Sequence, residues 1–239
     1  MPDIKNQGSK STCVAHAVAS LMEYHYEHQT KSKEKFSTDF IYGFRTLGYA
    51  AGEGMMIRDA LNTILNHGDA FEKDWPGNND FETASNNIFM QDYSDLNSLL
   101  DKAGLHRINS YYRCKKDNEI KTALMKHGPV VTSMNTYHGA TLVNDVYTWD
   151  AAATYGRHCV LIVGWNEQGW LIQNSWGEGY GGDGRFIIPY NFKLNESWGI
   201  IDNGQDDSAL KKPSKFIISI SALYNKIANA IIKLVSKRS

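Results

Sequence analysis

Residues that could perform covalent chemistry occur near both ends of the chain. Near the start, the polar segment Gln7-Gly8-Ser9-Lys10-Ser11-Thr12 leads directly into Cys13. Apolar residues then follow at helical spacing: Val14, Val18, Leu21, Met22 and Tyr26. Ser11 or Thr12 could cap this helix. Because the free N–H groups and the dipole at a helix N-terminus stabilise negative charge, the pattern predicts a lowered Cys13 pKa and a candidate nucleophile.

A candidate base and its partner occur far along the chain. His158 precedes an apolar run that ends at Trp165 and is predicted to be a strand with the histidine at its start. A turn at Asn166–Gly169 leads to a second strand, after which Asn174 follows. Pairing of the two strands would bring Asn174 beside His158. A thiolate nucleophile needs a base of this kind, and the base needs an orienting group.

Each of these residues also has a simpler structural interpretation. Free cysteine is among the most buried residue types, so Cys13 alone favours packing. A histidine at a strand end can bond to backbone, and asparagine is a common turn residue. The chemical interpretation therefore depends on all three occurring together.

Taken together, the blocks resemble the papain-like cysteine peptidases. The resemblance consists of Gln7 with Cys13, His158 before an apolar strand, and Asn174-Ser175-Trp176-Gly177 with its glycine-rich continuation. The spacing from cysteine to histidine and asparagine is close to the papain pattern. Bacterial members of the family have segments similar to these: Phe40-Ile41-Tyr42, Gly54–Leu61 and Asp74-Trp75-Pro76. The resemblance covers roughly residues 4–200 and implies an α+β, two-lobed fold with the active site in the cleft between a helical lobe and an antiparallel, β-barrel-like lobe.

The sequence departs from the family's Cys-Gly-Ser/Ala-Cys-Trp/Tyr signature at three positions. Lys10 replaces the first cysteine, Ser11 the glycine and Val14 the aromatic residue. The resemblance therefore implies that the disulfide that usually braces this loop is absent here.

The resemblance also implies the role of each site residue. Cys13 would be the nucleophile of a thioester mechanism, and His158 its acid and base. Asn174 would orient the imidazole, and Gln7 would stabilise the oxyanion together with the Cys13 backbone N–H. Trp176 is expected to be one of the substrate-binding residues, and it would also shield the hydrogen bond between His158 and Asn174.

Substrate contacts are expected on two segments. Gly54, Met55 and Met56 resemble the wall against which an extended peptide pairs its backbone, whereas Ser133 and Gly156 resemble residues beside the second subsite. Methionine adapts its shape, which suits an apolar or aromatic P2 side chain. The alternative is that Met55 and Met56 are interior residues of the first half.

Besides hydrolysis of peptide bonds, two other functions could use the same residues. An amine could replace water at the thioester, which would give a transpeptidase or acyltransferase, or the chain could be an inactive scaffold used for binding. No cofactor is expected. A peptide or protein is the expected partner, and the protein is expected to be a monomer.

Composition narrows the class of protein. The chain has 239 residues, 42% of them hydrophobic and 21% charged, with a net charge of −1, as in an ordinary globular protein. Residues 211–239 include lysines and an arginine but no acidic residue, so the remainder is acidic. An acidic body argues against nucleic-acid binding.

The cysteines and the first residues of the chain give some indication of the protein's cellular location. Cys13, Cys114 and Cys159 have neither metal-ligand spacing nor a disulfide pattern and are expected to be free. No apolar run approaches the roughly 20 residues of a membrane helix, and the first residues lack the form of a signal peptide. These features are compatible with the cytoplasm and with secretion after processing. Relatives usually have an inhibitory propeptide before this point, and none is expected in the given chain.

The predicted elements divide the chain into three parts. Helices are expected near 13–28, 37–47, 57–66, 93–103 and 118–126, and strands near 107–114, 130–135, 146–149, 158–165, 170–174 and 185–189. The parts are a helical lobe at 1–105, a β-rich lobe at 106–205 and a basic, amphipathic extension at 206–239. The extension could contact a membrane surface or a partner, or pack on the body.

Overall fold

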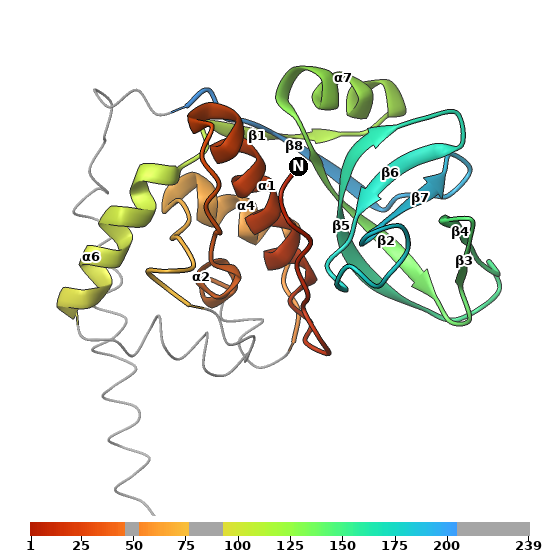
Figure 1. Ribbon diagram of the computed structural model, residues 1–239, viewed down its shortest axis with the longest axis horizontal. Coiled ribbons are helices and arrows are strands. Elements are labelled where there is room, and N and C mark those ends of the chain that lie inside the picture. Colours follow the sequence, from red (N-terminus) through yellow and green to blue (C-terminus); the bar gives the residue numbers. More distant parts are fainter. Residues whose placement is uncertain (46–52, 77–92, 205–239) are drawn as a thin grey trace, which may run out of the picture. The chain divides into compact units, whose positions relative to one another are not determined.

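Helices come first in the chain and strands follow (Figure 1). The computed structural model describes residues 1–45, 53–76 and 93–204. The helices are α1 (Cys13–Thr30), α2 (Thr38–Gly43), α4 (Ile57–Asn66), α6 (Tyr93–Ala103), the 3₁₀ turn η1 (Gly104–His106) and α7 (Asp117–His127). This order confirms the predicted α+β class.

Local sequence explains where several of these helices begin and end. The Ser37 hydroxyl caps α2 by accepting a 3.1 Å hydrogen bond from the Phe40 backbone N–H, as expected of a serine at this position. After α4, Gly68 has φ +78°, and a Cβ atom there would lie 1.8 Å from the Ala103 carbonyl oxygen. Only glycine fits this close approach of α4 to the end of α6.

Helix α1 lies at the centre of the described chain, between α2 and α4 on one side and strand β5 (Tyr155–Trp165) on the other (Figure 1). It is buried on most of its faces, including the small residues Ala15 and Ala19, so it lacks the single apolar stripe of a surface helix. The core around it takes residues from both halves of the chain: Val18, Leu21, Leu61, Leu161 and Trp198. Burial of α1 therefore fixes the helices against the sheet.

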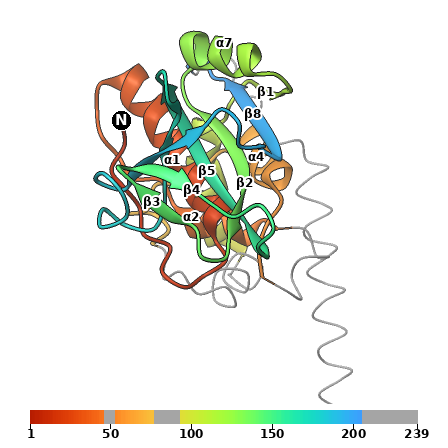
Figure 2. The same cartoon turned by 90° about the vertical axis from the view of Figure 1, so that its right-hand side faces the viewer.

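The strands form one sheet in the order β1-β8-β2-β5-β6-β7-β4-β3. Figure 1 labels all of them, and Figure 2 shows β1, β8, β2 and β5 from the side. Besides β5 they are β1 (Ser110–Cys114), β2 (Val130–Tyr137), β3 (Thr141–Val143), β4 (Val146–Thr148), β6 (Gly169–Gln173), β7 (Arg185–Pro189) and β8 (Glu196–Ile201). Pairing is antiparallel except for a parallel contact between β4 and β7. Within the described residues no pairing joins β1 to β3, so the sheet is open and resembles a barrel without closing into one.

Three details of the sheet differ from the sequence prediction. Strand β5 begins at Tyr155, so His158 lies inside the strand and not at its start. Strand β3 was missed because it is only three residues long, although its turn has the usual hairpin signal, with positive φ at Asn144 and Asp145. Strand β8 was missed because its sequence lacks polar–apolar alternation.

The predicted division at residues 105 and 106 remains a prediction. Helices α1 to α6 precede it and the strands follow it, with α7 placed among the strands. Met1–Gly204 form one compact unit. The predicted extension at 206–239 lies outside the described residues, as do residues 46 and 47 of the second predicted helix.

Candidate active site

Cys13 is the first residue of α1 and is half-buried. Burial raises the pKa of its thiol, while the backbone N–H groups of Cys159, Val14 and Cys13 itself act in the opposite direction. The sequence predicted a lowered pKa because it weighed the helix terminus and not desolvation. The predicted side-chain cap is also wrong, because the Thr12 side chain makes no cap hydrogen bond and its hydroxyl has no partner among the described residues.

The Cys13 thiol faces strand β5. The backbone N–H of Cys159 contributes to lowering the pKa of the Cys13 thiol, and Cys159 directly follows His158. The N-terminus of α1 and the first half of β5 are therefore in contact. This contact joins the two parts of the chain in which the candidate nucleophile and base were found.

His158 and Asn174 form a buried hydrogen bond. Nε2 of His158 lies 2.7 Å from Oδ1 of Asn174, which also accepts a 2.8 Å hydrogen bond from the Ser175 backbone N–H. Because Oδ1 accepts, Nε2 carries the proton, so Nδ1 is the basic nitrogen of the neutral ring. Burial lowers the pKa of His158 to about 4, and the hydrogen bond that the ring donates to Asn174 acts against this shift.

Trp176 covers the imidazole. Its ring stacks on that of His158 with 4.4 Å between the ring centroids and 21° between the planes. Tyr180 in turn contacts the indole edge-on at 4.7 Å. The indole therefore lies over the imidazole that bonds to Asn174, and its shielding role stays a prediction.

The Gln7 side chain is buried and held at both ends. Its Nε2 donates a 2.7 Å hydrogen bond to the Lys10 carbonyl, and its Oε1 accepts a 2.7 Å hydrogen bond from the Ser175 hydroxyl. One Nε2 hydrogen remains available to a ligand, since it has no acceptor among the described residues. Sequence reasoning missed the contribution of Ser175, although its place directly after Asn174 was a usable signal.

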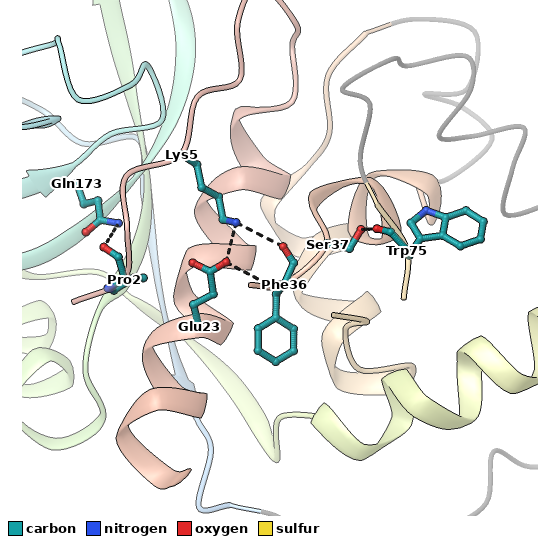
Figure 3. Close-up of polar contacts among 7 residues, drawn as sticks. All are labelled: Pro2, Lys5, Glu23, Phe36, Ser37, Trp75 and Gln173. Carbon is teal, nitrogen blue, oxygen red and sulfur yellow. Dashed lines mark hydrogen bonds and ion pairs between the residues drawn. The ribbon is translucent and has the colours of Figure 1, made fainter. Parts of the chain in front are cut away.

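The segment that carries Gln7 is itself anchored on both sides (Figure 3). The Lys5 ammonium lies 2.6 Å from a Glu23 carboxylate oxygen on α1, and the same oxygen accepts a hydrogen bond from the Phe36 backbone N–H. Gln173 donates a 3.4 Å hydrogen bond to the Pro2 carbonyl. Burial raises the pKa of Glu23, while the Lys5 charge lowers it. The segment thus connects α1 with the end of β6.

The predicted substrate-binding residues lie in two places. Ser133 on β2 pairs with Cys159 on β5, and Gly156 lies two residues before His158. Met55 packs with Cys13 against the core around α1, which agrees with the alternative that it is an interior residue. Met56 is 42% exposed.

The backbone N–H and carbonyl groups around Gly54 are only partly available to hydrogen-bond a ligand. Its N–H donates to the Tyr42 hydroxyl at 3.1 Å, and its carbonyl accepts from Arg45 at 3.3 Å. The Met56 carbonyl accepts from the backbone N–H groups at the start of α4. Among the described residues no hydrogen bond engages the N–H or the carbonyl of Met55, in contrast to the groups of Gly54.

The remaining cysteines are free, as predicted. Cys114 and Cys159 are buried, and burial raises the pKa of both thiols, so neither competes with Cys13 as a nucleophile. In the described part of the chain, no cluster of three or more possible ligands could hold a metal ion. The helices described there also include none with the length and apolar character to cross a membrane.

Comparisons with known proteins show the family to which the chain belongs. A family model described as papain family cysteine protease matches residues 1–202. A cysteine protease of Blomia tropicalis is 27% identical over 76% of this chain and 55% of its own length. The viral cathepsin of Adoxophyes honmai nucleopolyhedrovirus is 24% identical over 80% of this chain and 54% of its own length. The chain thus spans about half the length of these two relatives.

A solved structure extends the comparison to the fold. Xylellain, a cysteine protease from Xylella fastidiosa, superposes with a TM-score of 0.71 at 26% identity, covering 84% of each chain. This agreement supports the arrangement of helices and sheet that brings α1 against β5.

The stacking of Trp176 on His158 predicts a pKa change. In a Cys13→Ser background, which removes the thiol that could pair with the imidazole, we expect Trp176→Ala to raise the pKa of His158 from about 4 toward the ordinary value of about 6.5, because water regains access to the ring and desolvation weakens. Titration of the imidazole by NMR measures this shift. Trp165→Ala, at the far end of β5, is the matched control and should leave the value unchanged. An unshifted His158 in Trp176→Ala would show that the indole does not exclude water.

Proposed function

Because the chain belongs to the papain family of cysteine proteases, we propose that it hydrolyses peptide bonds through a thioester on Cys13. The match of the family model to residues 1–202 supports this activity. The single observation on which the proposal rests is the hydrogen bond of 2.7 Å between His158 and Asn174. His158 lies on β5, the strand that α1 and Cys13 pack against.

In the proposed resting state, Cys13 and His158 form a thiolate–imidazolium pair. Burial alone opposes both charges, since it raises the pKa of the thiol and lowers the pKa of the imidazole. The pair therefore depends on the attraction between opposite charges, which is stronger in a buried site than in water. With Nε2 bonded to Asn174, Nδ1 is the atom that takes the thiol proton.

Acylation and deacylation then follow from the same atoms. The thiolate attacks the peptide carbonyl, and the Nδ1–H of His158 protonates the leaving amine as the C–N bond breaks. Water attacks the thioester with His158 as base, and the carboxylic acid leaves as the thiol is restored. Each tetrahedral oxyanion would accept hydrogen bonds from the free Nε2 hydrogen of Gln7 and from the Cys13 backbone N–H.

We also propose that an extended substrate pairs its backbone with Met55. The N–H and carbonyl of Met55 have no hydrogen bond within the described part of the chain, which supports this choice over Gly54, whose groups are engaged by Tyr42 and Arg45. Met56, Ser133 and Gly156 would then border the P2 side chain. The exposed thioether of Met56 and the small residues at the other two positions favour an apolar or aromatic P2 group.

Two alternatives share this site. In a transpeptidase or acyltransferase, an amine would replace water at the thioester. In an inactive scaffold, the site would bind peptides without covalent chemistry. Covalent chemistry is favoured over the scaffold because Gln7, Cys13, His158 and Asn174 are all present, and His158 and Gln7 have hydrogen-bond partners that orient them. Hydrolysis is favoured over acyl transfer because the matching family is one of proteases.

Digestion of a mixed peptide library tests the activity and the P2 preference together. We expect new carboxyl and amino termini, identified by mass spectrometry, with apolar or aromatic residues two positions before the cleaved bond. Cys13→Ser, which keeps the size of the side chain, should lose cleavage, whereas Cys114→Ser should retain it. Ligated products would instead support acyl transfer, and intact peptides would support the scaffold.

Gln7→Ala tests the oxyanion role. We expect kcat to fall by about 10²–10³ with little change in KM, because the lost hydrogen bond forms mainly in the transition state. Steady-state kinetics on one cleaved peptide measures both constants. Gln29→Ala, on the exposed end of α1, is the control. Parental kcat in the Gln7 variant would remove this residue from the site.

A further inference from the structure

A side-chain hydrogen bond joins the nucleophile's loop to the proposed substrate wall. The Ser11 hydroxyl donates to Oε2 of Glu53 at 2.6 Å, across 42 positions of sequence. Ser11 lies two residues before Cys13, and Glu53 directly precedes Gly54. A hydroxyl bonded to a carboxylate at this distance is a charge-assisted hydrogen bond.

On its other side, the wall is fixed to the end of α2. The Gly54 N–H and carbonyl are bonded to Tyr42 and Arg45, respectively. Arg45 is only 4% exposed, and its guanidinium lies 4.0 Å from the centre of the Tyr42 ring. These contacts hold Gly54 against α2. The hydrogen bond between Ser11 and Glu53 adds a direct link to the loop that precedes Cys13.

This hydrogen bond holds a loop that lacks the disulfide usual in papain-like peptidases. The resemblance to papain-like peptidases places a disulfide-forming cysteine at Lys10, and the three cysteines of this chain are free. Ser11 is the next residue, and it occupies a position where the family signature has glycine, which has no side chain. The departure from the signature thus supplies the hydroxyl that makes the link.

We propose that the hydrogen bond between Ser11 and Glu53 is a positioning contact that holds Gly54–Met56 at a fixed distance from Cys13. This inference rests on the proposed peptidase function. Ser11 is half-buried and Glu53 is exposed, so loss of the bond changes global stability little. It frees the wall to move, which weakens the binding of an extended peptide while leaving the groups that carry out the chemistry in place.

Hydrogen exchange tests the link without any need for turnover. We expect Ser11→Ala and Glu53→Ala to accelerate amide exchange at Gly54, Met55 and Met56 relative to the parent, and Ser11→Thr, which keeps the hydroxyl, to restore protection. Ser9→Ala, in the same loop, is the matched control and should behave as the parent. Parental exchange rates in both Ser11→Ala and Glu53→Ala would overturn the proposal.

Kinetics tests the consequence for substrate. We expect each single variant to raise KM by about 2- to 5-fold for a peptide with an occupied P2 position, with kcat nearly unchanged. The double variant should lose no more than either single one, because both remove the same contact. Additive losses, or faster exchange with an unchanged KM, would overturn the positioning role. A parent without peptidase activity would instead refute the proposed function, and hydrogen exchange would still decide whether the link exists.

Discussion

The burial of α1 is the constraint on which the rest of the structure depends. This helix is enclosed by α2 and α4 on one side and by β5 on the other, and its core includes residues from both halves of the chain. Close packing leaves the helix little freedom to slide. Its first residue, Cys13, is therefore held near the strand that contains His158.

The same burial makes the site electrostatically demanding. Desolvation opposes a charged thiolate and a charged imidazolium alike, so isolated groups in these positions would stay neutral. The protein counters this with fixed dipoles: Asn174 on the imidazole, the Cys159 N–H toward the sulfur, and Gln7 held by Ser175 and Lys10. Such groups are already oriented before any substrate arrives, which is the arrangement that favours a developing charge.

The sequence was informative for features set by a local pattern. It was less informative for features set by packing between residues that are distant in sequence. Helix spacing predicted α1, and the turn at Asn166–Gly169 predicted the hairpin that brings Asn174 beside His158. Burial of Cys13 was not predictable, because α1 is covered by residues distant in sequence, and so the direction of its pKa shift was missed. The partners of Gly54 and Gln7 were missed for the same reason: Tyr42, Arg45 and Ser175 meet them only in the folded chain.

The pH dependence of Cys13 alkylation by iodoacetamide tests the central claim most directly, namely that this thiol is paired with His158. The account predicts that Cys13 reacts well below pH 8.5, the ordinary thiol pKa being about 8.5, and that His158→Ala removes this reactivity in folded protein. The claim would be contradicted if alkylation increased with pH as for an ordinary thiol, and did so equally in the parent and in His158→Ala.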